Sequence, residues 1–157
     1  MTYIIKATFY VGILTLFLFG GCKKNKDYEL YYQFKQHYWA RFNKLQFEIP
    51  LRPSPKGWDI YFFAHHTKDY PFDNLDFNMI MNTPTEERIN EYHFEIKKKN
   101  GGFMGECTQD SCIATIPLKK EIYLPEKGIL KIEIENLVPR LEVHGLLGVG
   151  IRMHPRG

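Results

Sequence analysis

Cys22 is the residue of this chain whose position most clearly indicates chemistry. It follows an apolar run over residues 7–19 and the glycines Gly20 and Gly21, and lysines come directly after it. The run is shorter than the about 20 apolar residues that a membrane-crossing helix needs. A single positive charge before the run and small residues after it are typical of a secretory signal. We therefore expect export of the chain and removal of its first segment.

A cysteine at such a position is the acceptor of lipid in bacterial lipoproteins, in which the thiol is acylated and the chain is cut before it. Several acyl chains anchor a protein stably, whereas one alone binds a membrane only marginally. We expect Cys22 to be lipidated, with a signal peptide at 1–21, the lipidated cysteine and a flexible tether at 22–29, and a folded domain at 30–157. Ordinary cleavage beside an incidental cysteine and an uncleaved short anchor are the alternatives.

The other two cysteines, Cys107 and Cys112, lie close together in "GECTQDSC". An exported chain reaches an oxidising compartment, where a pair at this spacing can close a tight loop. No second cysteine pair accompanies them, and His93 lies at no spacing typical of a metal ligand. The pattern favours a local disulfide over free thiols or a metal or redox site.

No combination of residues indicates catalysis, whether a nucleophile with its base, paired acids or a metal cluster. His65 and His66 are neighbours on an expected strand and would point to opposite faces, so they cannot easily bind one metal together. A site that joins His65 to His93 or His144 across strands is the alternative to ordinary surface or hydrogen-bonded histidines. The glycines of "GLLGVG" (145–150) lie in an alternating segment and do not open a helix, unlike a phosphate loop. We expect no cofactor, no metal and no enzymatic activity.

The elements that must position these residues are strands, because apolar side chains recur at every second position. No long stretch keeps a helical period, and segments rich in proline, glycine, asparagine and aspartate separate the strands. The small residues at 145–150 indicate a bulge or another segment packed closely on the sheet. Many short alternating strands predict an antiparallel β-sandwich, of which a jelly roll is one form. The expected strands include 30–34, 44–49, 58–64, 75–81, 92–96, 130–135 and 147–153.

Charge and aromatic content narrow the classes of partner. Removal of residues 1–21 takes away one charged side chain, Lys6, and leaves 20 basic residues against 18 acidic. This balance gives no basic footprint for nucleic acid. Aromatic residues make up 15% of the chain, and an exposed strip of them would bind sugar rings or a protein partner. Candidates for partial exposure are Tyr61, Phe63, Tyr70 and Phe72.

Several segments of the chain resemble the gliding-motility lipoproteins called GldH. Besides the start that ends at Cys22, "YYQFKQHYW" keeps an F-x-x-x-x-W spacing, and "HHTKDYPFDNLDF" contains a T-x-x-Y-P-[YF]-x-N-[LI] pattern. "GLLGVGIRM" is similar to the carboxy-terminal pattern of that family, in which glycines precede a final arginine. Together these segments span nearly the whole mature chain. The matching residues are Phe34, Trp39, Thr67, Tyr70, Pro71, Phe72, Asn74, Leu75, Gly145, Val149, Gly150, Ile151 and Arg152.

The resemblance implies a non-enzymatic, lipid-anchored protein of the cell envelope that acts with gliding components and the linked secretion apparatus through protein–protein contacts. A carbohydrate-binding lipoprotein that uses exposed aromatic side chains is the alternative function. Exported surface lipoproteins of gliding bacteria tend to carry an acidic cluster after the cysteine, whereas Lys23, Lys24 and Lys26 follow Cys22 here. We therefore expect an outer-membrane protein that faces the periplasm. The candidate interaction surface consists of Thr67, Tyr70, Pro71, Phe72 and Asn74.

Overall fold

A computed structural model describes residues 26–83, 86–123 and 127–156, and within these residues the chain forms eleven strands and no helix. Every strand pairing is antiparallel. The strands are β1 (Tyr28–Gln33), β2 (Tyr38–Ala40), β3 (Leu45–Leu51), β4 (Trp58–Thr67), β5 (Asn74–Asn82), β6 (Glu87–Glu95), β7 (Glu106–Cys107), β8 (Ser111–Ile122), β9 (Gly128–Asn136), β10 (Glu142–His144) and β11 (Leu146–Pro155).

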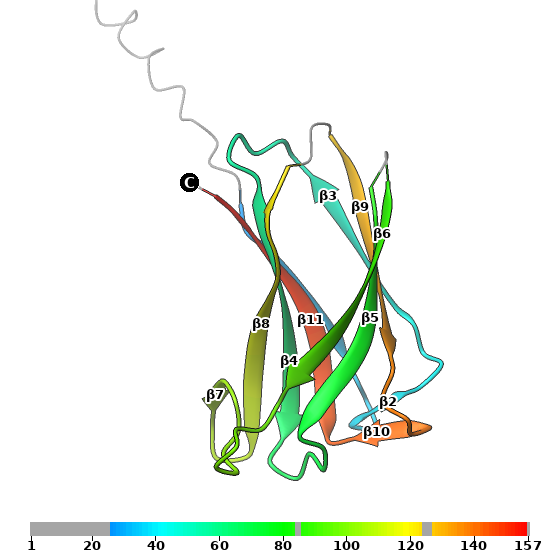
Figure 1. Cartoon of the computed structure of the whole chain (residues 1–157), viewed down its shortest axis with the longest axis vertical. Helices are drawn as coiled ribbons and strands as arrows, with labels where there is room; N and C mark the ends of the chain where they lie inside the picture. Colours follow the sequence, from blue (N-terminus) through cyan, green and yellow to red (C-terminus); the bar gives the residue numbers. More distant parts are fainter. Residues whose placement is uncertain (1–25, 84–85, 124–126, 157) are drawn as a thin grey trace, which may run out of the picture.

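Two sheets face each other in Figure 1, with β2 and β10 as a small separate pair at one end. One sheet has the order β1-β11-β4-β8-β7 and the other has the order β3-β9-β5-β6. The chain crosses from one sheet to the other between β3 and β4, between β4 and β5, between β6 and β8, and between β8 and β9. Strands that are neighbours within a sheet are therefore mostly distant in sequence. This is the arrangement of a jelly roll, in which two Greek keys form a sandwich. The predicted antiparallel sandwich is therefore confirmed.

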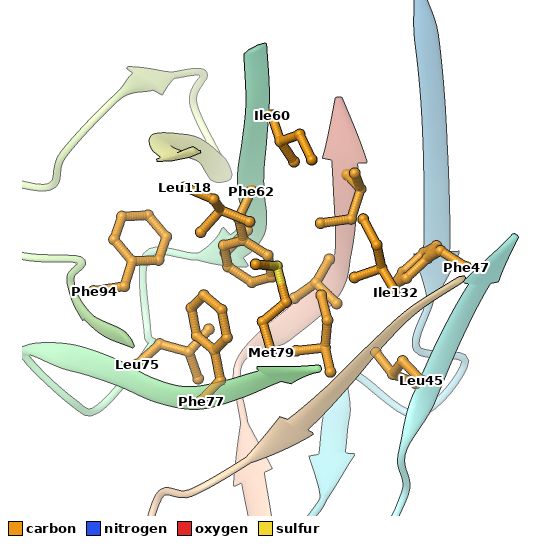
Figure 2. Close-up of a cluster of buried hydrophobic side chains, with 14 of the residues drawn as sticks. Leu45, Phe47, Ile60, Phe62, Leu75, Phe77, Met79, Phe94, Leu118 and Ile132 are labelled. Carbon is orange, nitrogen blue, oxygen red and sulfur yellow. The ribbon is translucent and has the colours of Figure 1, made fainter. Parts of the chain in front are cut away.

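The core lies between the sheets because each strand places alternate side chains inward. On β5 and β9 the alternation is regular, with fully buried Leu75, Phe77 and Met79 on one strand. The ring of Phe62 on β4 stacks on Phe77 with centroids 4.3 Å apart and meets Phe94 of β6 edge-on at 5.8 Å. Figure 2 shows these rings interleaved with aliphatic side chains from both sheets. Such paired rings add to the free energy gained from burial itself.

Tyrosine hydroxyls join the two sheets at both sides of the sandwich. Tyr28 of β1 donates a hydrogen bond to the carbonyl of Pro50 on β3 (2.6 Å), and Tyr92 of β6 donates to the carbonyl of Leu118 on β8 (3.2 Å). Burial raises the pKa of Tyr92. Each ring covers the core at one edge of the sandwich while its hydroxyl forms a hydrogen bond with the other sheet. Both edges are therefore covered without leaving a tyrosine hydroxyl unpaired.

One expected strand departs from the regular alternation. The alternating strand expected at 147–153 places Leu147 on the inward face with Val149, but Leu147 is half-buried and the neighbouring Leu146 is fully buried. The pairing of β11 with β4 shifts between Leu146 and Gly148, which marks a β-bulge. An extra residue on one strand exchanges the faces to which side chains point, and this explains why the prediction for Leu147 was wrong.

Candidate functional site

Three of the segments that resemble the family meet around Gly145, between β10 and β11. The N–H of Gly145 donates to the carbonyl of His37 (2.9 Å), and its own carbonyl accepts from the N–H of Thr67 (2.8 Å). Gly145 has a φ of 83°, and a β-carbon here would lie 2.9 Å from the Cα of Tyr70. Both the backbone angle and the close packing require glycine at this position.

These contacts all lie at one end of the sandwich, which we call the distal end. It consists of the connections 34–37, 41–44, 68–73 and 137–141 together with Gly145. The other end holds the start of β1 beside the end of β11, where Tyr28 pairs with Met153. In Figure 1 the carboxy terminus lies at this other end, and β2 and β10 lie at the distal end. The described chain therefore enters the domain at the end opposite the distal end.

Tyr70 was expected to be partly exposed, and this expectation is wrong. Its side chain is 1% exposed, and its hydroxyl donates to the carbonyl of Asn74 (3.0 Å). Its backbone N–H also donates to the carbonyl of Thr67 (3.2 Å). Burial, assisted by the carboxylate of Asp76, raises the pKa of Tyr70. Tyr70 thus fixes the shape of the β4–β5 connection and presents no surface to a partner.

The other residues of the candidate interaction surface differ in what they expose. Thr67 is half-buried and its hydroxyl donates to the carbonyl of Gly145 (3.4 Å). Phe72 is also half-buried, because its ring packs against the core and meets Tyr70 edge-on at 5.7 Å. The side-chain amide of Asn74 is 3.0 Å from Nδ1 of His93 and 3.4 Å from Oδ1 of Asp76. Pro71 is exposed, so only part of the predicted surface is open to a partner.

The segment 34–39 supports the distal end from inside. Phe34 and Trp39 are buried, and their rings stack with centroids 5.7 Å apart. The N–H of Phe34 donates to the carbonyl of Leu147 on β11 (2.9 Å). The indole N–H of Trp39 donates to the carbonyl of Asn43 (2.8 Å) in the next connection. The F-x-x-x-x-W spacing therefore has a structural role here.

Two exposed apolar side chains at the distal end were missed by sequence reasoning. Phe42 is 79% exposed and Leu141 is 73% exposed. They lie on neighbouring connections, because the N–H of Arg41 donates to the carbonyl of Leu141 (2.9 Å). The available signal was an apolar residue next to an arginine inside a turn, in "ARFN" and in "VPRLE", where no strand face accounts for it.

On the outward face of the larger sheet, two aromatic rings pack directly against glycines of β11. A β-carbon at Gly148 would lie 2.2 Å from the ring of Tyr31, and one at Gly150 would lie 2.3 Å from the ring of Phe63. The two rings stack 5.9 Å apart, and the guanidinium of Arg152 lies 4.6 Å from the Phe63 centroid. The glycine segment thus contains both features that were expected as alternatives, a bulge and a closely packed neighbouring segment. Because Tyr31 and Arg152 cover it, Phe63 is only 3% exposed, and the expectation of its exposure was wrong.

The histidines do not form a metal site within the described residues. His65 points outward, 2.9 Å from Oγ of Ser111 and 3.3 Å from the hydroxyl of Tyr31. His66 points inward and is fully buried, with Nδ1 2.9 Å from the carbonyl of Thr67 and with Nε2 lacking a partner in the described part of the chain. Burial lowers the pKa of both imidazoles.

Of the three cysteines, Cys107 and Cys112 are joined by a disulfide with Cα atoms 4.0 Å apart. They are directly paired on β7 and β8, so the bond fastens a two-residue strand to the edge of the larger sheet. Cys22 lies outside the described residues. Within 26–83, 86–123 and 127–156, no helix is long and apolar enough to cross a membrane.

Comparison with known proteins identifies relatives of the whole domain. The family described as "GldH lipoprotein" matches residues 26–153. A gliding motility lipoprotein GldH homolog of Christiangramia forsetii is 24% identical over 152 residues, which cover 92% of this chain and 93% of the relative. The gliding motility lipoprotein GldH of Flavobacterium johnsoniae is 23% identical over 155 residues, which cover 92% of this chain and 96% of the relative. No solved structure matches.

Proposed function

This chain belongs to the GldH lipoprotein family, and we propose that it supports gliding motility by binding other proteins of the cell envelope and its linked secretion apparatus, without catalysing a reaction. The observation that carries this proposal is the distal end. Residues of three family-like segments converge there on Gly145, at the end opposite the tether, and hold neighbouring connections with exposed apolar side chains. Ordered loops on a rigid scaffold are where binding residues concentrate.

Membrane attachment is proposed to occur through acyl chains on Cys22, with 1–21 removed and the residues from Cys22 up to the start of β1 at Tyr28 serving as the tether. From Cys22 to Tyr28 the chain can span at most about 20 Å at roughly 3.3–3.6 Å per residue. The ten residues of β11 span about 30 Å. The short tether therefore holds one end of the sandwich near the lipid and leaves the distal end accessible to other proteins.

The proposed location is the periplasmic face of the outer membrane, since lysines and no acidic cluster follow Cys22. Protease added to intact cells should then leave the protein uncut, and it should cut the protein once the outer membrane is permeabilised. Digestion in intact cells would place the domain on the cell surface.

The carbohydrate-binding alternative gains no support from the described residues. A sugar platform would need a strip of exposed rings on one sheet. On the outward face of the larger sheet Tyr31 is 43% exposed, but its neighbour Phe63 is covered. No further function is proposed on this basis.

The experiment that tests the proposed function is complementation of cells that lack the protein. Wild-type protein should restore gliding and incorporate a palmitate analogue. Cys22→Ala should lose the label, leave the membrane fraction and fail to restore gliding. A matched Cys107→Ala, Cys112→Ala variant should keep the label. Gliding by cells without the protein would contradict the role in motility, and unchanged labelling of Cys22→Ala would contradict the anchor.

A further inference from the structure

We propose that Phe42 and Leu141, with Arg41 and Arg140 beside them, form a docking tip that inserts into an apolar pocket with an acidic rim on a partner protein. The inference rests on the proposed function, because it assigns the site and the partner chemistry through which that function would operate. Phe42 and Leu141 are the two most exposed large apolar side chains of the described residues.

The turn that carries Phe42 is fixed by hydrogen bonds. The N–H of Asn43 donates to the carbonyl of Ala40 (3.0 Å), so Arg41 and Phe42 occupy the two central positions of a four-residue turn. The carbonyl of Asn43 accepts the bond from the buried indole of Trp39 (2.8 Å). The fully buried ring of Trp39 thus holds the base of the turn, while Phe42 at the tip of the turn projects into solvent.

The connection that carries Leu141 is fixed in the same way. The N–H of Leu137 donates to the carbonyl of Asp76 (2.9 Å), and the N–H of Arg140 donates to that of Val138 (2.7 Å). The N–H of Val138 donates to the side chain of the buried Asn136 (2.8 Å).

The Arg41–Leu141 hydrogen bond then joins the two connections. Groups already held in place lose little conformational freedom on binding, which raises affinity.

Charge identifies the chemistry of the partner. Arg41 and Arg140 are both exposed, and neither takes part in an ion pair within the described residues. Nearby polar side chains already have partners, since Nζ of Lys44 lies 3.2 Å from a carboxylate oxygen of Glu133 and Nε2 of His144 lies 3.1 Å from one of Glu142. Aromatic side chains and arginine are enriched at protein interfaces, and unmatched guanidinium groups pair well with carboxylates. An acidic rim around an apolar pocket is complementary to this tip.

Position in the fold favours a protein over the anchoring membrane. An apolar tip with arginines could also enter a lipid headgroup layer. The tether, however, joins the domain at the end opposite the tip, so lipid on Cys22 draws the other end toward the membrane. The tip is therefore directed to a second protein.

The test is photocrosslinking from position 42 of the full-length, lipidated protein in its own cell envelope. A benzophenone amino acid replaces Phe42. In a control variant of the same protein it replaces Ile89, which is 63% exposed near the tethered end. Position 42 should give a discrete adduct with another protein, and position 89 should not. Arg41→Glu with Arg140→Glu should reduce the adduct at least about tenfold, since charge reversal at close pairs costs more than 1.4 kcal/mol. Arg41→Lys with Arg140→Lys should largely retain it.

Other products overturn the proposal. An adduct with phospholipid would assign the tip to a membrane, and an adduct of twice the mass of this chain would assign it to self-association. No adduct, or one that survives charge reversal, would also contradict the assigned partner chemistry. Because crosslinking is measured without reference to movement, failure of the tip and failure of the motility role are distinguishable.

Discussion

The backbone of Tyr70 packs so closely on Gly145 that a β-carbon on the glycine would lie 2.9 Å from the Cα of Tyr70. This contact joins the β4–β5 connection to the β10–β11 connection, although Tyr70 and Gly145 are 75 residues apart in the chain. Neither segment could keep its shape if the other moved. The distal end is therefore a single supported unit, and its stability can be tested at these two residues.

Gly145→Ala should lower the free energy of unfolding by more than the backbone angle alone explains. A residue with a β-carbon at positive φ costs about 1–3 kcal/mol, and here the added carbon also meets backbone. Gly101→Ala is the matched control, because Gly101 has a φ of 84° with nothing within 4 Å of the added carbon. Urea unfolding of both variants measures the difference. Equal losses would show that the close approach contributes nothing.

Tyr70 should behave as a core residue. Tyr70→Ala should cost about 3–5 kcal/mol of stability, as truncation of buried aromatic side chains does, and Tyr70→Phe should cost about 1 kcal/mol through loss of the hydrogen bond to Asn74. Phe42→Ala serves as the exposed control and should change stability by less than about 0.5 kcal/mol. Urea midpoints compare the three. A Tyr70→Ala protein as stable as Phe42→Ala would restore Tyr70 to the candidate surface.

His66 should make the protein less stable in mild acid. Burial lowers its pKa in the folded state, whereas the unfolded chain binds a proton near the ordinary value of about 6.5. The unfolded state thus binds more protons below that pH, so stability is full above it and falls as the pH decreases. His66→Gln removes this titration while keeping an amide that can donate to Thr67. The stability difference between wild type and variant should narrow from pH 7 to pH 5, and a constant difference would contradict the prediction.

Loss of the Cys107–Cys112 bond should have a modest effect on stability. Cys107→Ala with Cys112→Ala should lower stability by about 2 kcal/mol, because a short loop loses little entropy when it is closed. In the non-reduced native protein neither thiol should react with a maleimide, and both should react after reduction and unfolding. Reaction of both thiols in the native, non-reduced protein would show that the bond is absent.

The strands could be predicted from the sequence because a sandwich leaves one face of each strand in solvent. Leu45, Phe47 and Ile49 alternate with polar residues for this reason, and all three are buried. Periodicity within one segment reports only that segment's own faces. It therefore gave the wrong face for Leu147, because the exact position of the bulge beside Gly148 depends on the pairing of β11 with β4.

The distal end could be predicted only in part. Its residues were located by the family-like patterns at Thr67, Tyr70 and Gly145, but their burial follows from contacts between connections far apart in sequence. Exposure likewise depends on neighbours, which is why Tyr70 was misjudged. Phe42 and Leu141 gave no periodic signal because they lie in turns, and what distinguishes them is a hydrogen bond between two connections.

The measurement that tests the central claim most directly is gliding by cells that produce distal-end variants. Phe42→Ser with Leu141→Ser should leave the urea midpoint and membrane attachment unchanged and stop the cells from gliding. The matched control is Ile89→Ser with Ile129→Ser, since these side chains are 63% and 52% exposed and lie toward the end opposite the distal end. Cells with this control variant should glide normally. Normal gliding by the stable distal variant, or equal loss with both variants, would contradict a partner site at the distal end.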